Sequence, residues 1–267
     1  MKNSRLLHLA AVAVLPWLAP ATAQAQTVLL RDDFSGSTLN TANWNLGTWM
    51  LGQTQLGNSP VITNGMARLT FDTYRFRGTE IWSKATFNRG NGLELEARVR
   101  LNNLPSGLVT SIFTYVYNNA TQRSDELDIE ILSKQVNASG GGDPVLFTTW
   151  NDWYEPTGLY QNGINHWSFS QFFPNFDVNQ WHIYVIRWLP AVPPSLPART
   201  EWLIDGVLVA SSDKAQPDLA TPVRFNFWAP ASSWTDAYSS TLKPARKASG
   251  NVRYFYDIDH VEVRQLP

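Results

Sequence analysis

Three carboxylates alternate within five consecutive residues: Glu126, Asp128 and Glu130, separated by Leu127 and Ile129. Successive side chains of a β-strand point to opposite faces, so this spacing puts the three acids on one face and the two aliphatic side chains on the other. Like charges crowded on one face hold one carboxyl group protonated while a neighbour stays ionised. An acid paired with a carboxylate is the group set that cleaves glycosidic bonds.

Two other interpretations of these acids stay open on the residues alone. They can form an ordinary solvated strand face, although such faces normally mix acids with neutral or basic residues. They can also hold a hard divalent cation, although neither a nearby His nor an EF-hand spacing supports this. The backbone separates Glu126 from Glu130 by roughly 13 Å. Two long side chains that lean together on a concave sheet can close this gap to the roughly 5.5 Å of a retaining glycosidase pair.

The remaining chain consists of short apolar or alternating runs between turn signals, with no sustained helical period. Residues 94–100 alternate strictly between charged and apolar side chains, as a half-buried antiparallel strand does. The missing crossover helices argue against a parallel α/β fold. The sequence therefore predicts an all-β fold, an antiparallel β-sandwich. The clearest strand candidates are residues 66–71, 93–101, 108–117, 126–132, 181–189, 200–204, 223–228 and 252–263, with turns at 64–65, 91–92 and 205–206.

The first 25 residues have the organisation of an export signal. Lys2 and Arg5 precede an apolar stretch over residues 6–18, and small residues at 21–25 offer cleavage sites. The apolar stretch is shorter than the roughly 20 residues that span a bilayer. We therefore expect a signal peptide at 1–25, a secreted or periplasmic protein without membrane attachment in its mature form, and a single catalytic domain at 26–267.

The amino-acid composition limits the classes of molecule that this protein can bind. The 267 residues carry a formal net charge of −1 and show no cluster of Lys and Arg, which argues against nucleic acid. Cysteine is absent, which excludes thiol chemistry, whereas 12 Trp suit stacking against the flat faces of sugar rings. We expect a monomer that binds a polysaccharide.

The stretch from Ser124 to Ile131, Ser-Asp-Glu-Leu-Asp-Ile-Glu-Ile, resembles the active-site strand of glycoside hydrolase family 16, whose pattern is Glu-x-Asp-x-Glu. Flanking segments resemble the same family, so the likeness spans nearly the whole mature chain. These segments are residues 32–36, 39–44, 78–80, 93–100, 181–188, 202–206 and 225–228.

The resemblance implies a concanavalin A-like jelly roll and a retaining mechanism without a catalytic cofactor. Glu126 would be the nucleophile, Glu130 the acid/base and Asp128 their partner. Substrates would be β-1,3 or mixed β-1,3/1,4 glucans cut within the chain, with agar, carrageenan and xyloglucan in other branches. Many family glucanases carry Trp where this chain has Ser124, which leaves the branch open. A transglycosylase that remodels polysaccharide and a non-catalytic glycan-binding jelly roll are the alternatives.

Further binding residues also follow from the resemblance. Glu80, Asn226 and Trp228 would face the sugar, and Asp259 would help to hold a structural calcium ion on the convex side. Trp150 and Trp234 fall in loop-like segments, where large aromatic side chains form either sugar platforms or satellite clusters.

Overall fold

The computed structural model describes residues 26–267 except 140–141, 152–160, 163–164, 168–172 and 174–175. The predicted signal peptide and much of the aromatic-rich segment after β11 lie outside the described residues. The strands are β1 (Thr27–Asp32), β2 (Trp44–Leu46), β3 (Met50–Leu51), β4 (Thr54–Leu56), β5 (Val61–Thr63), β6 (Met66–Asp72), β7 (Arg77–Ser83), β8 (Leu93–Leu101), β9 (Val109–Asn118), β10 (Arg123–Leu132), β11 (Val145–Asn151), β12 (Gln161–Asn162), β13 (Asn165–Trp167), β14 (His182–Leu189), β15 (Arg199–Ile204), β16 (Val207–Ser212), β17 (Val223–Trp228) and β18 (Arg253–Gln265). Helical structure in the described residues is limited to α1 (Ser133–Val136) and a 3₁₀ turn (Ala248–Gly250).

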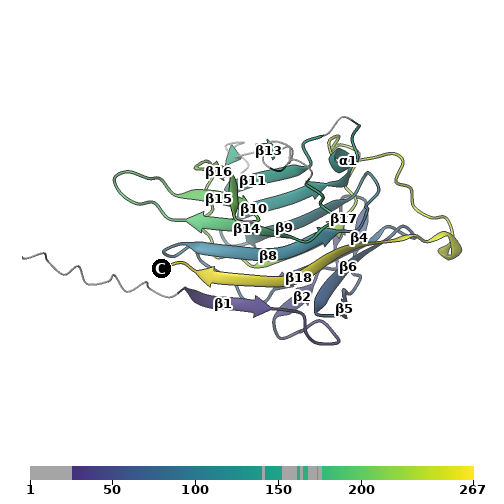
Figure 1. Ribbon diagram of the computed structural model, residues 1–267, viewed down its shortest axis with the longest axis horizontal. Helices are drawn as coiled ribbons and strands as arrows, with labels where there is room; N and C mark the ends of the chain where they lie inside the picture. Colours follow the sequence, from purple (N-terminus) through teal and green to yellow (C-terminus); the bar gives the residue numbers. More distant parts are fainter. Residues whose placement is uncertain (1–25, 140–141, 152–160, 163–164, 168–172, 174–175) are drawn as a thin grey trace, which may run out of the picture.

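The strands form two layers, which makes the predicted β-sandwich correct. One layer runs β2-β7-β17-β9-β10-β11 and is called the cleft sheet below. The other runs β16-β15-β14-β8-β18, with β1 and β6 both paired to the far side of β18, and is called the outer sheet. Figure 1 shows β18 in yellow between β8 and β1. All of these pairings are antiparallel, as the alternation of residues 94–100 predicts.

The core lies between the two sheets and comes from the apolar face of each strand. Ile129 of the cleft sheet and Val99 of the outer sheet are both fully buried there. Large aromatic side chains fill the remaining space, among them Trp202, Phe225 and Tyr256. Three of the 12 Trp, namely Trp44, Trp188 and Trp202, are therefore part of this core and not available to a sugar. None of the helices in the described part of the chain is long and apolar enough to cross a membrane.

Two of the predicted turns have the backbone that their residues favour. Asn64 and Gly65 have φ of 51° and 69°, and Asp205 and Gly206 have φ of 48° and 80°. Positive φ at both central residues defines the type I′ turn, whose twist matches that of the strands it joins. These turns set the β5–β6 and β15–β16 hairpins and hence their registers.

Candidate active site

The acid-bearing strand β10 lies inside the cleft sheet, between β9 and β11. Its register with β9 is unbroken from Arg123 opposite Asn118 to Leu132 opposite Val109. Leu127 and Ile129 are fully buried in the core, so the three acids share the opposite face, as the alternation predicts. The pairing sets what stands beside each acid: Tyr115 and Trp150 beside Glu126, Phe113 and Thr148 beside Asp128, Ser111 and Leu146 beside Glu130.

This face opens into a pocket of about 390 Å³. Glu126 and Glu130 both line it, and Asp128, which is 3% exposed, lies between them beneath the surface. The other lining residues come from β3, β7, β9 and β17 and the segment before β3: Trp49, Met50, Leu51, Glu80, Ser111, Phe113, Tyr115, Arg224, Asn226 and Trp228. Apolar walls with a few convergent polar groups are typical of a ligand site.

The electrostatics separate the two glutamates by their partners. Burial, together with the charge of Glu130, raises the pKa of Glu126 to about 8. Burial, together with the charge of Asp128, raises the pKa of Glu130 to about 8 as well. A hydrogen bond with Asp128 and the charge of Arg224 favour the ionised form of Glu126, and the charge of Glu80 opposes it. For Glu130, a 3.3 Å bond from Ser111 favours the ionised form. The pKa values of the two glutamates are thus equal, and the difference between them lies in their contacts: Glu126 has a hydrogen-bonding acid and a nearby guanidinium, and Glu130 has a hydroxyl.

A chain of hydrogen bonds holds Asp128 in the orientation that serves Glu126. The indole Nε1–H of Trp150 donates to Thr148 Oγ1 at 3.0 Å, and the Thr148 hydroxyl donates to Asp128 Oδ2. Indole nitrogen can only donate, so the single hydroxyl proton of Thr148 must point towards Asp128. Burial and the charge of Glu126 raise the pKa of Asp128 well above its usual range. Both effects favour the protonated form of Asp128, and because Oδ2 accepts from Thr148, the proton of that form is directed at Glu126.

Replacing Thr148 with Val should lower kcat by roughly 10- to 100-fold with little change in KM, because a buried carboxyl group loses its donor. Thr148→Ser keeps the hydroxyl and should retain most of the activity, which makes it the matched control. Steady-state kinetics of the three proteins test this. A Val variant with wild-type kcat would show that the hydrogen bond does not position Asp128.

Three predicted binding residues lie at the pocket wall on neighbouring strands. Asn226 of β17 pairs in register with Glu80 of β7, and Trp228 follows on the same face. Glu80 is a buried acid: it is 2% exposed and accepts a 2.9 Å bond from Arg224. Burial raises the pKa of Glu80 to about 7, and the charge of Arg224 opposes the rise.

Of the two tryptophans expected in loop-like segments, Trp150 lies in a strand and Trp234 lies in a loop. Trp150 belongs to strand β11, so the loop assignment is wrong there, and its indole nitrogen is bonded to Thr148. Trp234 does follow β17 in a loop, and its ring packs on Trp228 with centroids 5.8 Å apart. Trp234 thus supports the pocket wall from outside the set of lining residues.

Sequence reasoning missed three polar residues that contact the acids, Arg224, Thr148 and Ser111, and the apolar and aromatic lining residues Trp49, Met50, Leu51, Phe113 and Tyr115. The alternation of residues 223–228 already puts Arg224 on the face of Asn226 and Trp228, so a signal for it was present. No such signal exists for Thr148 and Ser111. They reach the acids only through the pairing of β10 with β11 and β9.

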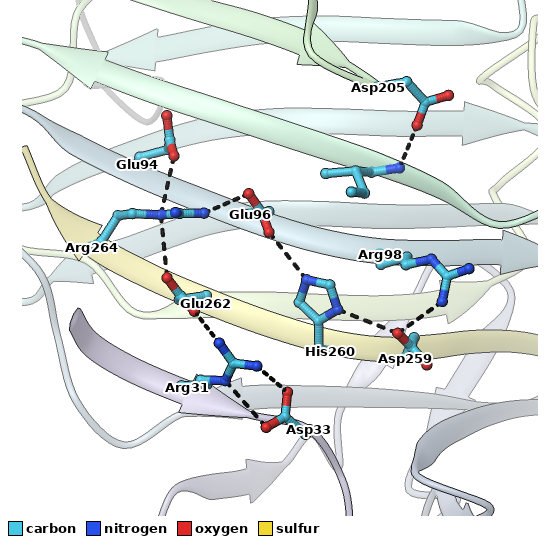
Figure 2. Close-up of polar contacts among 11 residues, drawn as sticks. Arg31, Asp33, Glu94, Glu96, Arg98, Asp205, Asp259, His260, Glu262 and Arg264 are labelled. Atoms are coloured by element: carbon cyan, nitrogen blue, oxygen red, sulfur yellow. Dashed lines mark hydrogen bonds and ion pairs between the residues drawn. The ribbon is translucent and has the colours of Figure 1, made fainter. Parts of the chain in front are cut away.

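The surroundings of Asp259 do not fit the calcium ion expected there. Its carboxylate Oδ2 pairs with Arg98 at 3.0 Å and with His260 Nδ1 at 3.3 Å, and His260 also contacts Glu96 at 3.1 Å (Figure 2). The hydrogen bond with Glu96 raises the pKa of His260 despite its partial burial. The side chains bonded to Asp259 are thus an arginine and a histidine, both nitrogen donors, whereas calcium needs several oxygen ligands. Nowhere in the described residues do three or more His, Cys, Asp or Glu side chains gather to hold a metal.

Figure 2 shows that these contacts continue along the outer sheet as a chain of alternating charges. Arg264 joins Glu94, Glu96 and Glu262, and Glu262 leads to Arg31 of β1. The chain of ion pairs therefore ties β1, β8 and β18 together.

Metal removal should consequently leave stability unchanged. The unfolding midpoint measured with excess calcium should equal the midpoint measured with excess EGTA, because ion pairs occupy the site around Asp259. Asp259→Asn should shift it only slightly, since exposed ion pairs contribute about 0–1 kcal/mol. A midpoint that falls on chelation, and does so less in Asp259→Asn, would establish a calcium site at this residue.

Comparison with known proteins places this geometry in context. The family model described as glycosyl hydrolases family 16 matches residues 51–248. None of the curated proteins to which the sequence was compared matches it.

Solved structures share the fold at low identity. Bacillus licheniformis β-glucanase is 22% identical, with 90% of this chain and 99% of that chain covered and a TM-score of 0.62. LamA from Zobellia galactanivorans, in complex with laminaritriose and laminaritetraose, is 12% identical, with 90% and 99% covered and a TM-score of 0.62. A pseudo β-1,3-glucanase of Mycobacterium tuberculosis is 16% identical, with 88% and 98% covered and a TM-score of 0.62.

Proposed function

The chain belongs to glycoside hydrolase family 16, and from this premise we propose that it is a secreted, endo-acting, retaining hydrolase of β-1,3 or mixed β-1,3/1,4 glucans. The observation that carries the proposal is the unequal partnering of two glutamates in one pocket. Glu126 has an acid and a guanidinium that favour its charge, and Glu130 has neither. The glucan specificity draws on the similarity of the fold to LamA, solved in complex with laminaritriose and laminaritetraose, and to the β-glucanase of Bacillus licheniformis.

In the proposed first step, the Glu126 carboxylate attacks the anomeric carbon while Glu130 gives its proton to the departing glycosidic oxygen. This forms a glycosyl ester on Glu126 and leaves Glu130 ionised. In the second step, Glu130 takes a proton from water, whose oxygen attacks the same carbon and releases Glu126. Two inversions give net retention. The proton of Asp128 stays directed at Glu126, so Asp128 stabilises the negative charge of Glu126 whenever that carboxyl group is ionised.

A substrate screen tests the proposal. The purified protein should rapidly shorten the chains of laminarin or lichenan and give oligosaccharides of mixed length, which is the signature of internal cleavage. Agarose, κ-carrageenan and xyloglucan serve as the comparison polymers. Proton NMR of the first product should show the β-anomer before mutarotation; an α-anomer would refute the retaining mechanism.

Other outcomes identify the alternatives. Glycosyl transfer to added oligosaccharides that exceeds hydrolysis would make the protein a transglycosylase. Binding without cleavage would make it a glycan-binding jelly roll, and the pseudo-glucanase among the similar folds makes this a necessary control. Export can be tested by N-terminal sequencing of the protein recovered outside the cytoplasm, with cleavage expected near residue 25.

A further inference from the structure

Arg224 brings a guanidinium into a pocket otherwise dominated by acids. It stands on β17 two residues before Asn226 and pairs in register with Trp82 of β7. Among the residues that line this pocket it is the single basic one, against Glu80, Glu126 and Glu130. The contacts of this cation indicate what it contributes to the pocket.

The surroundings hold the Arg224 side chain in one orientation. Nη1 donates to Glu80 Oε1 at 2.9 Å, and Nε donates to the carbonyl oxygen of Tyr115 at 3.1 Å. Three aromatic rings surround the guanidinium carbon, with centroids at 5.0 Å for Trp82, 5.3 Å for Tyr115 and 6.0 Å for Trp49. The side chain is only 12% exposed. Such a guanidinium is preorganised and loses little freedom when a ligand binds.

Polar groups at this wall still lack partners. A guanidinium has five N–H groups, and within the described part of the chain only two of those of Arg224 have an acceptor. The buried Asn226 Oδ1 and Trp228 Nε1 likewise have no hydrogen-bond partner there. Buried polar atoms without a partner in the protein are generally satisfied by water or by a ligand. The wall is therefore equipped with both donors and acceptors for a polar ligand.

The charges of the residues that line this side of the pocket determine which class of polar ligand can bind. Arg224 is neutralised by Glu80, which leaves Glu126 and Glu130 facing the same space. A sulfate or carboxylate on the ligand would find no unpaired cation here, because Glu80 already pairs with Arg224. A sugar hydroxyl both donates and accepts, so one hydroxyl can donate to Glu80 while its neighbour accepts from Arg224. An uncharged sugar ring satisfies both partners.

We propose that Arg224 is a specificity-determining residue: with Glu80 it forms a rigid donor–acceptor pair that binds adjacent hydroxyls of an uncharged sugar ring. The pair selects neutral polymers over sulfated or uronic ones. This inference rests on the proposed function, because it assigns the substrate class of the same pocket.

Binding is measured by calorimetry in a Glu126→Gln background, so that no substrate turns over. The probes are laminarihexaose, a lichenan-derived hexasaccharide and neoagarohexaose, which are neutral, and the sulfated κ-neocarrahexaose. Arg224→Met should weaken binding of the best neutral probe by roughly 10- to 100-fold, the worth of a charge-assisted hydrogen bond. Arg224→Lys should recover only part of this, since an ammonium lacks the planar fork. The sulfated probe should bind weakly to all variants.

Two controls separate recognition from folding. Arg75→Met makes the same change at an exposed arginine that stacks on Tyr74 outside the pocket, and should leave affinity unchanged. The double variant Glu80→Gln with Arg224→Met leaves no unpaired buried charge, so it should unfold near the wild-type temperature and still bind weakly.

Three results would overturn the inference. They are a double variant that binds as tightly as its Glu126→Gln parent, tight binding of the sulfated probe through Arg224, and no binding of any neutral probe. Failure of the proposed function looks different. It appears as a wild-type protein that binds neutral probes through Arg224 yet cleaves none of the β-glucans.

Discussion

Glu126→Gln should abolish cleavage of the wild-type substrate while the protein stays folded. Gln cannot become the carboxylate that attacks the anomeric carbon, and it forms no glycosyl ester. Loss of a single catalytic nucleophile costs up to about 10⁶ in kcat in hydrolases. Reducing-end release measured at high enzyme concentration, against wild-type protein at matched concentration, gives the ratio.

Thermal unfolding provides the folding control for Glu126→Gln, and the sign of its effect follows from the pKa. The folded-state pKa of Glu126, about 8, lies above its ordinary value of 4.5 because of burial and the charge of Glu130. The folded state thus holds this proton more tightly, and its stability falls as pH rises from about 4.5 to 8. Replacing Glu126 with Gln removes this pH-dependent loss of folding stability. At pH 7 the variant should unfold at the wild-type temperature or above it; an active, well-folded variant would remove Glu126 from the mechanism.

Glu130→Ala should lose activity according to the leaving group. On polysaccharide the loss should be about 10²- to 10⁴-fold, which is the usual contribution of general acid catalysis. An aryl β-glycoside with an acidic phenol needs no proton on departure, so formation of the glycosyl ester should stay near the wild-type rate. Added azide should then accept the glycosyl group and speed turnover. Pre-steady-state release of the phenol, followed by product analysis, measures both effects.

The pH profile supplies the matching control for Glu130. Burial and the charge of Asp128 raise the pKa of Glu130 to about 8, so the protonated acid persists through neutral pH. Wild-type kcat/KM on polysaccharide should fall as pH rises through this value, and the alkaline limb should vanish in Glu130→Ala. Equal losses on both substrate types, with an unchanged profile, would mean that another residue supplies the proton.

Local pattern in the sequence determined the strands and their faces. The alternation of residues 126–130 was enough to separate acids from core, because the side-chain period of a strand holds wherever the strand lies. The Asn64-Gly65 and Asp205-Gly206 pairs marked hairpins because they favour positive φ. The resemblance carried by residues 124–131 named the family correctly.

Only the tertiary structure decided which side chains stand beside the acids. Thr148 is opposite Asp128 and Arg224 reaches Glu80 because strands far apart in sequence pair in one register, and a shift of one residue would turn every side chain to the other face. The same reason explains Trp150, whose place on β11 depends on its pairing with β10, and Asp259, whose arginine and histidine partners come from two strands. Sequence alone thus located the three acids, while long-range strand pairing determined which side chains stand beside each of them.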